Sequence, residues 1–386
     1  MNHREFGQEA FNNDQFLAGG ITLFISGFIG FIGNTFVLII TYRILRYRKN
    51  IPSILILFLA WTDFLTFPLI YPQSLIKYFF GVYIGDYSAC DFQGTVITFL
   101  YGVSILLVLI MSIDRLLALY KPFCYEQHIS YDKEKVKVTA IGVSAAGFTI
   151  ALLPTFGVGR NVLHFPGTFC LFEWGAKTVD GIALLYIYMT LLSIAILAIV
   201  FCNFTVVLLA WRLMRRLHSE STLGDKETAS TCQTKKKHSN RGDMEMQFAK
   251  LSCMTAIAIV GCWSLFLIRL TMIQAGYPFD AFIDFTAVRL ASLHSVVNPW
   301  FYPLLRRKYR EGFWYLITWI GHVVTCTLIK RPTNTLDDIV GGTPRTKRSK
   351  KMQKVDERRR SSSQRFLSTT TLSASVTTDS KSTDKK

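Results

Sequence analysis

Two apolar segments of this sequence each contain a charged side chain whose position needs a chemical explanation. Arg289 lies near the start of the apolar run 282–305, and Asp63 lies within the run 54–71. A charge inside a hydrocarbon-soluble helix is costly unless it finds a partner, faces the protein interior or reaches an interface. Each residue therefore predicts a polar site, and Arg289 is a candidate for binding an anion.

The carboxyl group of Asp63 is open to two interpretations. It must face the protein interior, pair with polar neighbours or an ion, or be protonated. One interpretation is a structural polar knot with Asn34 and Asn298. The other is a conformational switch, or a cation site near Asp63.

Tyr78 and Thr168 are the polar residues that could meet Arg289. Tyr78 follows Asp63 by fifteen residues, which is about 22 Å of helix. Thr168 lies in the loop that contains Pro166, Gly167 and Cys170. Tyr78 could equally be a tyrosine at a membrane interface. Thr168 could belong to a lid or to a merely well-ordered loop.

The elements that must position these residues are membrane-spanning helices. Half of the 386 residues are apolar, and they come in blocks. A bilayer core of about 30 Å needs roughly 20 helical residues to cross it. Seven blocks meet this requirement: 21–42, 54–71, 95–120, 138–156, 181–211, 251–273 and 282–305. The prediction is an all-α membrane protein with seven spans.

The net charge of +17 follows this topology. Basic residues concentrate in alternate loops, as the positive-inside rule predicts for cytoplasmic segments. This distribution predicts a multi-pass protein of the plasma membrane, with an extracellular N-terminus and a cytoplasmic C-terminus. It argues against a soluble nucleic-acid binder, which would need a continuous basic face.

The same topology places the eight cysteines in two different environments, the outer loops and the rest of the chain. Only Cys90 and Cys170 fall in outer loops, on the oxidising side of the membrane, so we expect them to form a disulfide. Arg269, near the outer end of the sixth span, is expected to extend outward or to pair with an acid of a loop.

Asp114 and Arg115 follow one another at the cytoplasmic end of the third span. The pair could be ordinary interfacial charges or a releasable ionic latch. No metal-ligand cluster, nucleophile elbow or phosphate-binding loop occurs in the sequence, so neither an enzyme nor a cofactor is predicted.

The segments outside the spans are assigned by composition. Residues 1–20 form an extracellular tail, 21–305 the seven-span bundle, and 211–250 its third cytoplasmic loop. Residues 306–329 favour a helix in the cytoplasmic interface, with Cys326 open to palmitoylation, over an eighth span. Residues 330–386 are predicted to be disordered, with Ser361, Ser362 and Ser363 as phosphorylation candidates.

Several motifs together resemble the rhodopsin-like G-protein-coupled receptors. They occur in the order of that family and cover the whole bundle: Gly33 with Asn34, Leu59 and Ala60 with Asp63, Cys90 with Cys170, Asp114 with Arg115, and Asn298 and Pro299 with Tyr302. The resemblance implies a seven-transmembrane receptor in which Asp63, Asn298, Tyr302, Asp114 and Arg115 serve as activation switches.

Two stretches resemble the prostanoid receptors more narrowly: residues 166–170, and residues 289–292 with 298–302. This resemblance implies that Arg289, Thr168 and Tyr78 hold the carboxylate of a prostaglandin, with Ser292 close to the ligand. The chain departs from the family's usual pattern at Asn298, where an aspartate is common, and at Phe169, where a tryptophan is common.

The segments around Ser221 and Glu245 resemble the prostaglandin E2 receptors of the branch coupled to the G protein Gs. The resemblance implies a receptor that binds a prostaglandin, activates a heterotrimeric G protein and raises cAMP, with arrestin and receptor kinases as partners of its tail. A receptor for another anionic lipid or carboxylate is the alternative within this class. A transporter or channel is the alternative outside it, although the internal repeats that it would show are not visible.

Overall fold

The structure, a computed structural model, describes residues 13–47, 50–125, 133–223, 229–325 and 335–341. Among these, the side chains of residues 123, 133, 216–223 and 229–245 are not described. The chain divides into two units, Met1–Leu316 and Ile317–Lys386.

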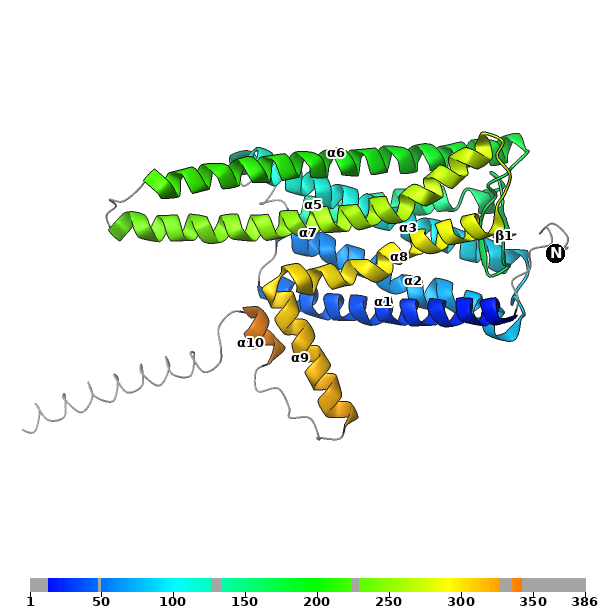
Figure 1. The fold of residues 1–386 in the computed structure, drawn as a ribbon, viewed down its shortest axis with the longest axis horizontal. Coiled ribbons are helices and arrows are strands. Elements are labelled where there is room, and N and C mark those ends of the chain that lie inside the picture. The colour runs from blue at the N-terminus through cyan, green and yellow to red at the C-terminus, as the bar shows by residue number, and fades with distance from the viewer. Residues whose placement is uncertain (1–12, 48–49, 126–132, 224–228, 326–334, 342–386) are drawn as a thin grey trace, which may run out of the picture. The chain divides into compact units, whose positions relative to one another are not determined.

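Long helices packed side by side form the first unit (Figure 1). Within the described residues they are α1 (Asn13–Tyr47), α2 (Ile51–Phe80), α3 (Tyr87–Tyr120), α5 (Lys133–Ala151), α6 (Val179–Leu223), α7 (Ala229–Gln274) and α8 (Ala281–Leu305). The predicted bundle of seven helices is confirmed. α1 begins at Asn13, so it includes residues that the sequence assigned to the N-terminal tail.

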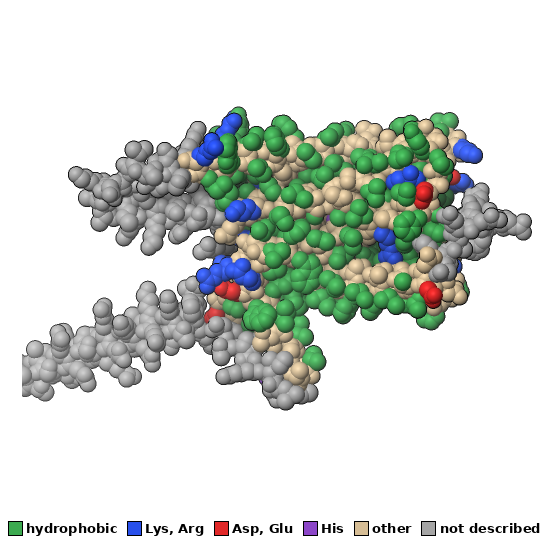
Figure 2. Space-filling model, in the orientation of Figure 1, with side chains coloured by type: hydrophobic (Ala, Val, Ile, Leu, Met, Phe, Trp, Pro, Cys, Tyr) green, Lys and Arg blue, Asp and Glu red, His purple; other side chains and the backbone are tan. Residues whose placement is uncertain are grey.

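Five of these helices contain a segment long and apolar enough to cross a membrane, namely α1, α2, α3, Val179–Arg215 of α6 and Met246–Gln274 of α7. The other two are more polar. α5 has three lysines and a glutamate among its first five residues, and α8 contains Asp284 and Arg289. Apolar side chains cover the flank of the bundle, while Lys and Arg side chains gather toward its ends (Figure 2).

Local sequence signals fix where the helices begin and bend. Asn50 and Asp280 accept hydrogen bonds from the backbone N–H groups of Ser53 and Ile283, at 3.2 and 2.9 Å, and so cap α2 and α8. Pro299 lies inside α8, where a proline bends a helix. A Cβ atom on Gly33 would lie 2.8 Å from the Pro299 ring, so glycine at this position lets α1 approach α8 closely.

A short antiparallel hairpin lies at one end of the bundle, hereafter the hairpin end. β1 (Asn161–His164) pairs with β2 (Phe169–Phe172). Cys170 of β2 forms the predicted disulfide with Cys90, in the first turn of α3. The Cys170 N–H also donates to the Gln93 side-chain oxygen at 2.8 Å. These two links attach the hairpin to α3.

Removing the disulfide by the double substitution Cys90→Ser and Cys170→Ser should lower stability by about 2–5 kcal/mol. The bond closes a separation of 80 residues, and it fixes the strand next to Thr168. Thermal unfolding of the receptor in detergent measures the effect. Cys124→Ser, which changes an exposed free cysteine, is the control, and an unfolding temperature equal to that of the control would contradict the prediction.

His164 stacks between two aromatic rings of the hairpin end. Its ring centroid lies 4.0 Å from Trp174 and 5.6 Å from Phe169. Its Nε2 lies 3.1 Å from the Phe172 carbonyl oxygen and 3.3 Å from that of Leu171. Burial lowers the pKa of His164 to about 4, despite the opposing effects of these carbonyls and of Glu173.

This lowered pKa predicts a loss of stability in acid. The unfolded chain binds a proton at His164 near pH 6.5, while the folded chain resists it, so the contribution is complete above pH 6.5 and is lost as the pH falls toward 4. We expect a loss of about 2 kcal/mol between pH 7 and pH 4.5. His164→Phe keeps the aromatic stack without the proton site. Thermal unfolding curves that shift equally with pH in both proteins would contradict the assignment.

α8 is followed by α9 (Arg307–Val324), whose last residues belong to the second unit together with α10 (Leu336–Gly341). In the first unit, the Tyr309 hydroxyl lies 2.8 Å from that of Thr41 on α1, and the Phe313 ring contacts Phe36 edge to face. A helix thus exists where one was expected, and its interfacial position stays a prediction. Cys326 and Ser361, Ser362 and Ser363 lie outside the described residues.

Candidate functional site

Arg289, Tyr78 and Thr168 meet at the hairpin end, although they come from α8, α2 and the turn before β2. The Arg289 guanidinium donates to the Tyr78 hydroxyl oxygen at 3.3 Å, and the Thr168 hydroxyl donates to the same oxygen at 3.4 Å. Tyr78 and Thr168 are only 5% and 2% exposed. Since Tyr78 accepts both bonds, its own hydroxyl hydrogen is left to donate to a further group.

The Arg289 guanidinium is surrounded by neutral groups. Its Nη2 donates to the Gly19 carbonyl oxygen at 2.7 Å, and its guanidinium carbon lies 5.4 Å from the Tyr78 ring and 5.1 Å from the Phe285 ring. No acidic side chain of the described residues forms an ion pair with it. A partly buried guanidinium in such surroundings is suited to bind a carboxylate.

Gly19 is a residue of this cluster that the sequence pattern did not single out. A Cβ atom there would lie 2.9 Å from the Tyr78 ring, so only glycine lets α1 pass close enough for its carbonyl to reach Arg289. The pair Gly19 and Gly20 near the start of an apolar segment was the available signal.

An apolar cavity of about 270 Å³ lies among the helices of the bundle, next to strand β2 of the hairpin. The side chains that line it come from α3, α5, α6, α7, α8 and β2, and include Tyr101, Leu171, Trp263, Phe266 and Ala291. Arg289, Tyr78 and Thr168 are not among the lining residues. The cluster of Arg289, Tyr78 and Thr168 and the apolar cavity are therefore adjacent rather than continuous in this structure.

Ser292 lies between the cluster and the cavity. Its hydroxyl donates to the Arg289 carbonyl oxygen at 2.7 Å and lies beside the phenols of Tyr71 and Tyr101. Tyr101 itself lines the cavity. A ligand that extends from Arg289 into the cavity would pass these three hydroxyl groups.

Two residues that line the cavity, Trp263 and Ala291, contact the imidazole of His294. The Trp263 ring lies 5.8 Å from that of His294, which is fully buried. His294 Nδ1 lies 2.6 Å from the Ala291 carbonyl oxygen and 3.4 Å from Trp263 Nε1. Its Nε2 has no hydrogen-bond partner among the described residues.

Asp63 and Asn298 are joined as the polar-knot interpretation expects. The Asn298 amide donates to one Asp63 carboxylate oxygen at 3.0 Å, and the Ser104 hydroxyl donates to the other at 2.9 Å. Asn34 instead donates to the Ser295 carbonyl oxygen at 3.0 Å. Asn34 therefore joins α1 to α8 without touching Asp63, which the motif alone could not specify.

A cation near Asp63 stays a prediction. The described residues contain no group of three or more His, Cys, Asp or Glu side chains that could hold a metal ion. Tyr302, the last of the predicted switch residues on α8, is 1% exposed, and its ring lies 5.4 Å from that of Tyr309.

Asp114 and Arg115 pair with each other at the opposite end of the bundle. Arg115 Nε donates to Asp114 Oδ2 at 2.9 Å, and the Tyr125 hydroxyl donates to Asp114 Oδ1 at 2.8 Å. Both charged residues are buried. The ion pair therefore joins neighbours on α3, and Tyr125 is a partner that the sequence pattern did not indicate.

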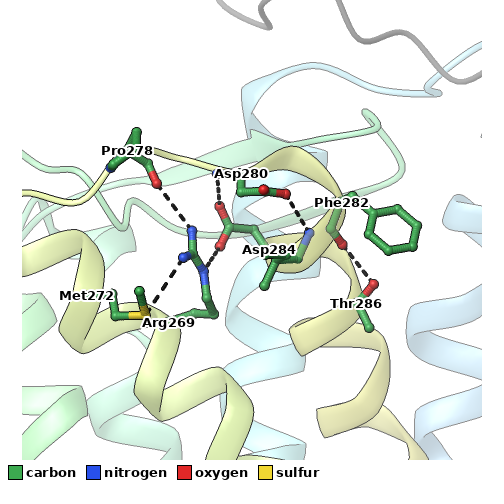
Figure 3. A network of polar contacts seen from close by, with 8 residues as sticks. Arg269, Met272, Pro278, Asp280, Phe282, Asp284 and Thr286 are labelled. Carbon is green, nitrogen blue, oxygen red and sulfur yellow. Dashed lines mark hydrogen bonds and ion pairs between the residues drawn. The ribbon is translucent and has the colours of Figure 1, made fainter.

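A second buried ion pair links α7 to α8 at the hairpin end (Figure 3). Arg269 Nε donates to Asp284 Oδ1 at 2.6 Å, and a terminal nitrogen of Arg269 donates to the Pro278 carbonyl oxygen at 3.3 Å. Asp284 Oδ2 accepts from the Asp280 N–H at 3.0 Å. Arg269 does pair with an acid, but that acid lies in the first turn of α8 rather than in a loop.

Residues 33–302 match the family profile described as "7 transmembrane receptor (rhodopsin family)". Among solved structures, the chain is similar to the crystal structure of squid rhodopsin, with a TM-score of 0.71 and 23% identity over 88% of this chain and 94% of that one. This second similarity concerns the fold.

Three similar curated proteins are described as prostaglandin E2 receptors. The EP4 subtype of Rattus norvegicus is 26% identical over 72% of this chain and 63% of that receptor. The EP2 subtype of Canis lupus familiaris is 26% identical over 66% and 70%. The EP3 subtype of Oryctolagus cuniculus is 28% identical over 77% and 74%. The match thus spans less than two thirds of the EP4 receptor.

Proposed function

The chain belongs to the rhodopsin family of seven-transmembrane receptors, which are not enzymes, and we propose that it is a receptor for a prostanoid, prostaglandin E2 in the first instance. The observation that carries the proposal is the cluster of Arg289, Tyr78 and Thr168 beside an apolar cavity. The guanidinium and the two hydroxyl groups would bind the ligand's carboxylate. The acyl chains would occupy the cavity.

The similarity to receptors described as binding prostaglandin E2 supports the same ligand. The carboxylate is the group that an uncompensated arginine recognises best, because bonds between two charged partners are strongest away from water. Ser292, between the cluster and the cavity, would contact the part of the ligand that joins its acid to its ring.

The basic loops support an orientation with the hairpin end outside the cell and Asp114 and Arg115 at the cytoplasmic face. Ligand binding at the outer end would favour one of two pre-existing conformations. Trp263, Asp63, Asn298 and Tyr302 would carry that preference to a heterotrimeric G protein. Coupling to Gs and a rise in cAMP is the proposed output, with arrestin and receptor kinases acting on the tail.

Cells that express the chain, challenged with each prostaglandin in turn, test the proposal through paired cAMP and calcium measurements. We expect a cAMP rise that is largest for prostaglandin E2 and absent from untransfected cells. A calcium response alone would contradict Gs coupling and leave the ligand proposal standing. No response to any prostaglandin, from a receptor shown to reach the cell surface, would overturn the prostanoid assignment and favour another anionic lipid.

A further inference from the structure

The apolar cavity reaches the flank of the bundle as well as its interior. Two of the residues that line it, Leu191 and Ile194 of α6, are 46% and 59% exposed. Leu171 and Phe172 of β2 also line it, but they are only 5% and 6% exposed. The cavity is therefore closed next to β2, and the exposed part of its lining faces sideways, toward the surface that a transmembrane protein presents to the bilayer.

This side opening lies over α3, between α5 and α6. The Tyr188 hydroxyl of α6 donates to the Ile150 carbonyl oxygen of α5 at 3.0 Å, which links the two helices at one edge of the opening. The other residues of the rim are half-buried or exposed, and all of them line the cavity: Gly102, Leu106, Gly147, Leu191 and Ile194. The rim is thus built from glycines and aliphatic side chains of three helices.

Gly102 leaves the α3 side of the opening free of side-chain atoms. A Cβ atom at this position would meet no heavy atom within 4 Å, so no neighbouring residue requires a glycine here. Glycine inside a helix is destabilising relative to alanine, and the close approach of a ligand to the backbone is one reason to have it. Gly147 on α5 differs, because a Cβ atom there would lie 2.9 Å from Val103. Gly102 therefore marks space that a molecule from outside the chain can fill.

The chemistry of the opening selects a hydrocarbon occupant. Among the described residues that line the cavity, none carries a charge and most are aliphatic or aromatic. A charged or strongly hydrated group would lose its hydration there without gaining a charged partner. A hydrocarbon chain would instead supply the dispersion contacts that the lining of an unfilled void lacks. Because the opening is continuous with the surface that faces the bilayer, the nearest source of such a chain is a membrane lipid.

We propose that an acyl chain of a bilayer phospholipid enters through the side opening and occupies the cavity in the ligand-free receptor. The phosphate group stays outside, since no cationic side chain lines the described cavity. This lipid site requires only that the protein spans a membrane. Its consequence for signalling rests on the proposed function: a prostaglandin whose chains use the same cavity must displace the lipid chain, so the two exclude one another.

Photochemical labelling with a phosphatidylcholine that carries a diazirine near the end of one acyl chain tests the lipid site. The full-length receptor is placed in nanodiscs that contain this lipid and irradiated without ligand, and mass spectrometry of its peptides identifies the labelled residues. Three residues of α7 provide the readout. Phe266 lines the cavity and is 4% exposed, Ile259 does not line it and is 0% exposed, and Ile257 is 66% exposed. We expect label at Phe266 and Ile257 and none at Ile259.

Gly102→Leu places a side chain in the opening, where it meets no other atom of the protein. We expect it to lower the label at Phe266, relative to that at Ile257, about tenfold, because the added groups and the lipid chain would overpack the site. Gly261→Leu is the matched control, since a Cβ atom on Gly261 also meets no heavy atom but does not line the cavity. Ile194→Trp, at an exposed position of the rim, is a second narrowing variant that should act in the same direction.

Label at Ile257 without label at Phe266 would overturn the lipid site. So would label at Phe266 that neither Gly102→Leu nor Ile194→Trp reduces, because the chain would then not use the side opening. Prostaglandin E2 added before irradiation separates this result from the proposed function. Label at Phe266 that persists at saturating prostaglandin would refute the shared cavity and leave the lipid site standing. A receptor that responds to prostaglandin E2 but shows no label at Phe266 would refute the lipid site alone.

Discussion

Arg289→Ala is expected to weaken prostaglandin E2 binding about 100-fold or more, since losing one partner of a desolvated charge pair costs about 2–5 kcal/mol. The substitution removes the cation of the cluster and leaves Tyr78 and Thr168 as neutral donors. Competition binding with labelled prostaglandin E2 on membranes measures the change in affinity.

Arg289→Lys is the matched control for this experiment. It keeps the positive charge but loses the planar fork that can bond Tyr78, the Gly19 carbonyl and a carboxylate together. We expect an affinity between those of the wild type and of Arg289→Ala. Undiminished affinity in Arg289→Ala, at equal surface expression, would refute the carboxylate site.

Asp284→Ala is expected to destabilise the receptor by about 3–5 kcal/mol, because it leaves the Arg269 guanidinium buried without its carboxylate. Both side chains of this pair are nearly inaccessible, at 8% and 7% exposure. The Asp284 carboxylate also accepts the Asp280 N–H, so α8 loses a contact at its start. Thermal unfolding in detergent measures the loss.

The double variant Arg269→Leu with Asp284→Leu separates charge from packing. A buried ion pair replaced by apolar residues of similar size is often tolerated, so we expect the double variant to unfold at a higher temperature than Asp284→Ala. The single variants Arg269→Leu and Asp284→Leu complete the comparison. If their separate losses add up to the loss in the double variant, the pair is not coupled, which would contradict the structural role assigned to it.

The arrangement of the bundle could be predicted because it depends on short, continuous stretches of the sequence. Apolar blocks of membrane length fixed most of the helices, and the position of two cysteines in loops on one side fixed the disulfide. The predicted ends of the helices were less accurate. α1 begins at Asn13, since polar residues before an apolar block can still continue a helix.

The meeting of Arg289, Tyr78 and Thr168 could also be predicted, but the full set of their hydrogen bonds could not. The topology placed Arg289, Tyr78 and Thr168 at one level, yet the Gly19 carbonyl that completes the cluster depends on how closely α1 packs. The hydrogen-bond partner of Asn34 could not be predicted either. A motif identified it as important, and only the packing of α1 on α8 determined that it bonds the Ser295 carbonyl rather than Asp63.

Residues whose role depends on contact between helices gave the weakest signal in the sequence. Asp284, for example, is one acid in the first turn of a helix. Its partner, Arg269, comes from another helix. Such pairs follow from the packing angles of the bundle, which the sequence pattern does not contain.

The central claim, that the cluster binds the carboxylate of a prostanoid, is tested most directly by changing the ligand instead of the protein. Competition binding should compare prostaglandin E2 with its methyl ester, which keeps the ring and both chains but carries no charge. We predict that the wild-type receptor prefers the acid by about 10- to 100-fold, and that Arg289→Ala loses this preference. Equal affinity of the wild-type receptor for acid and ester would contradict the account.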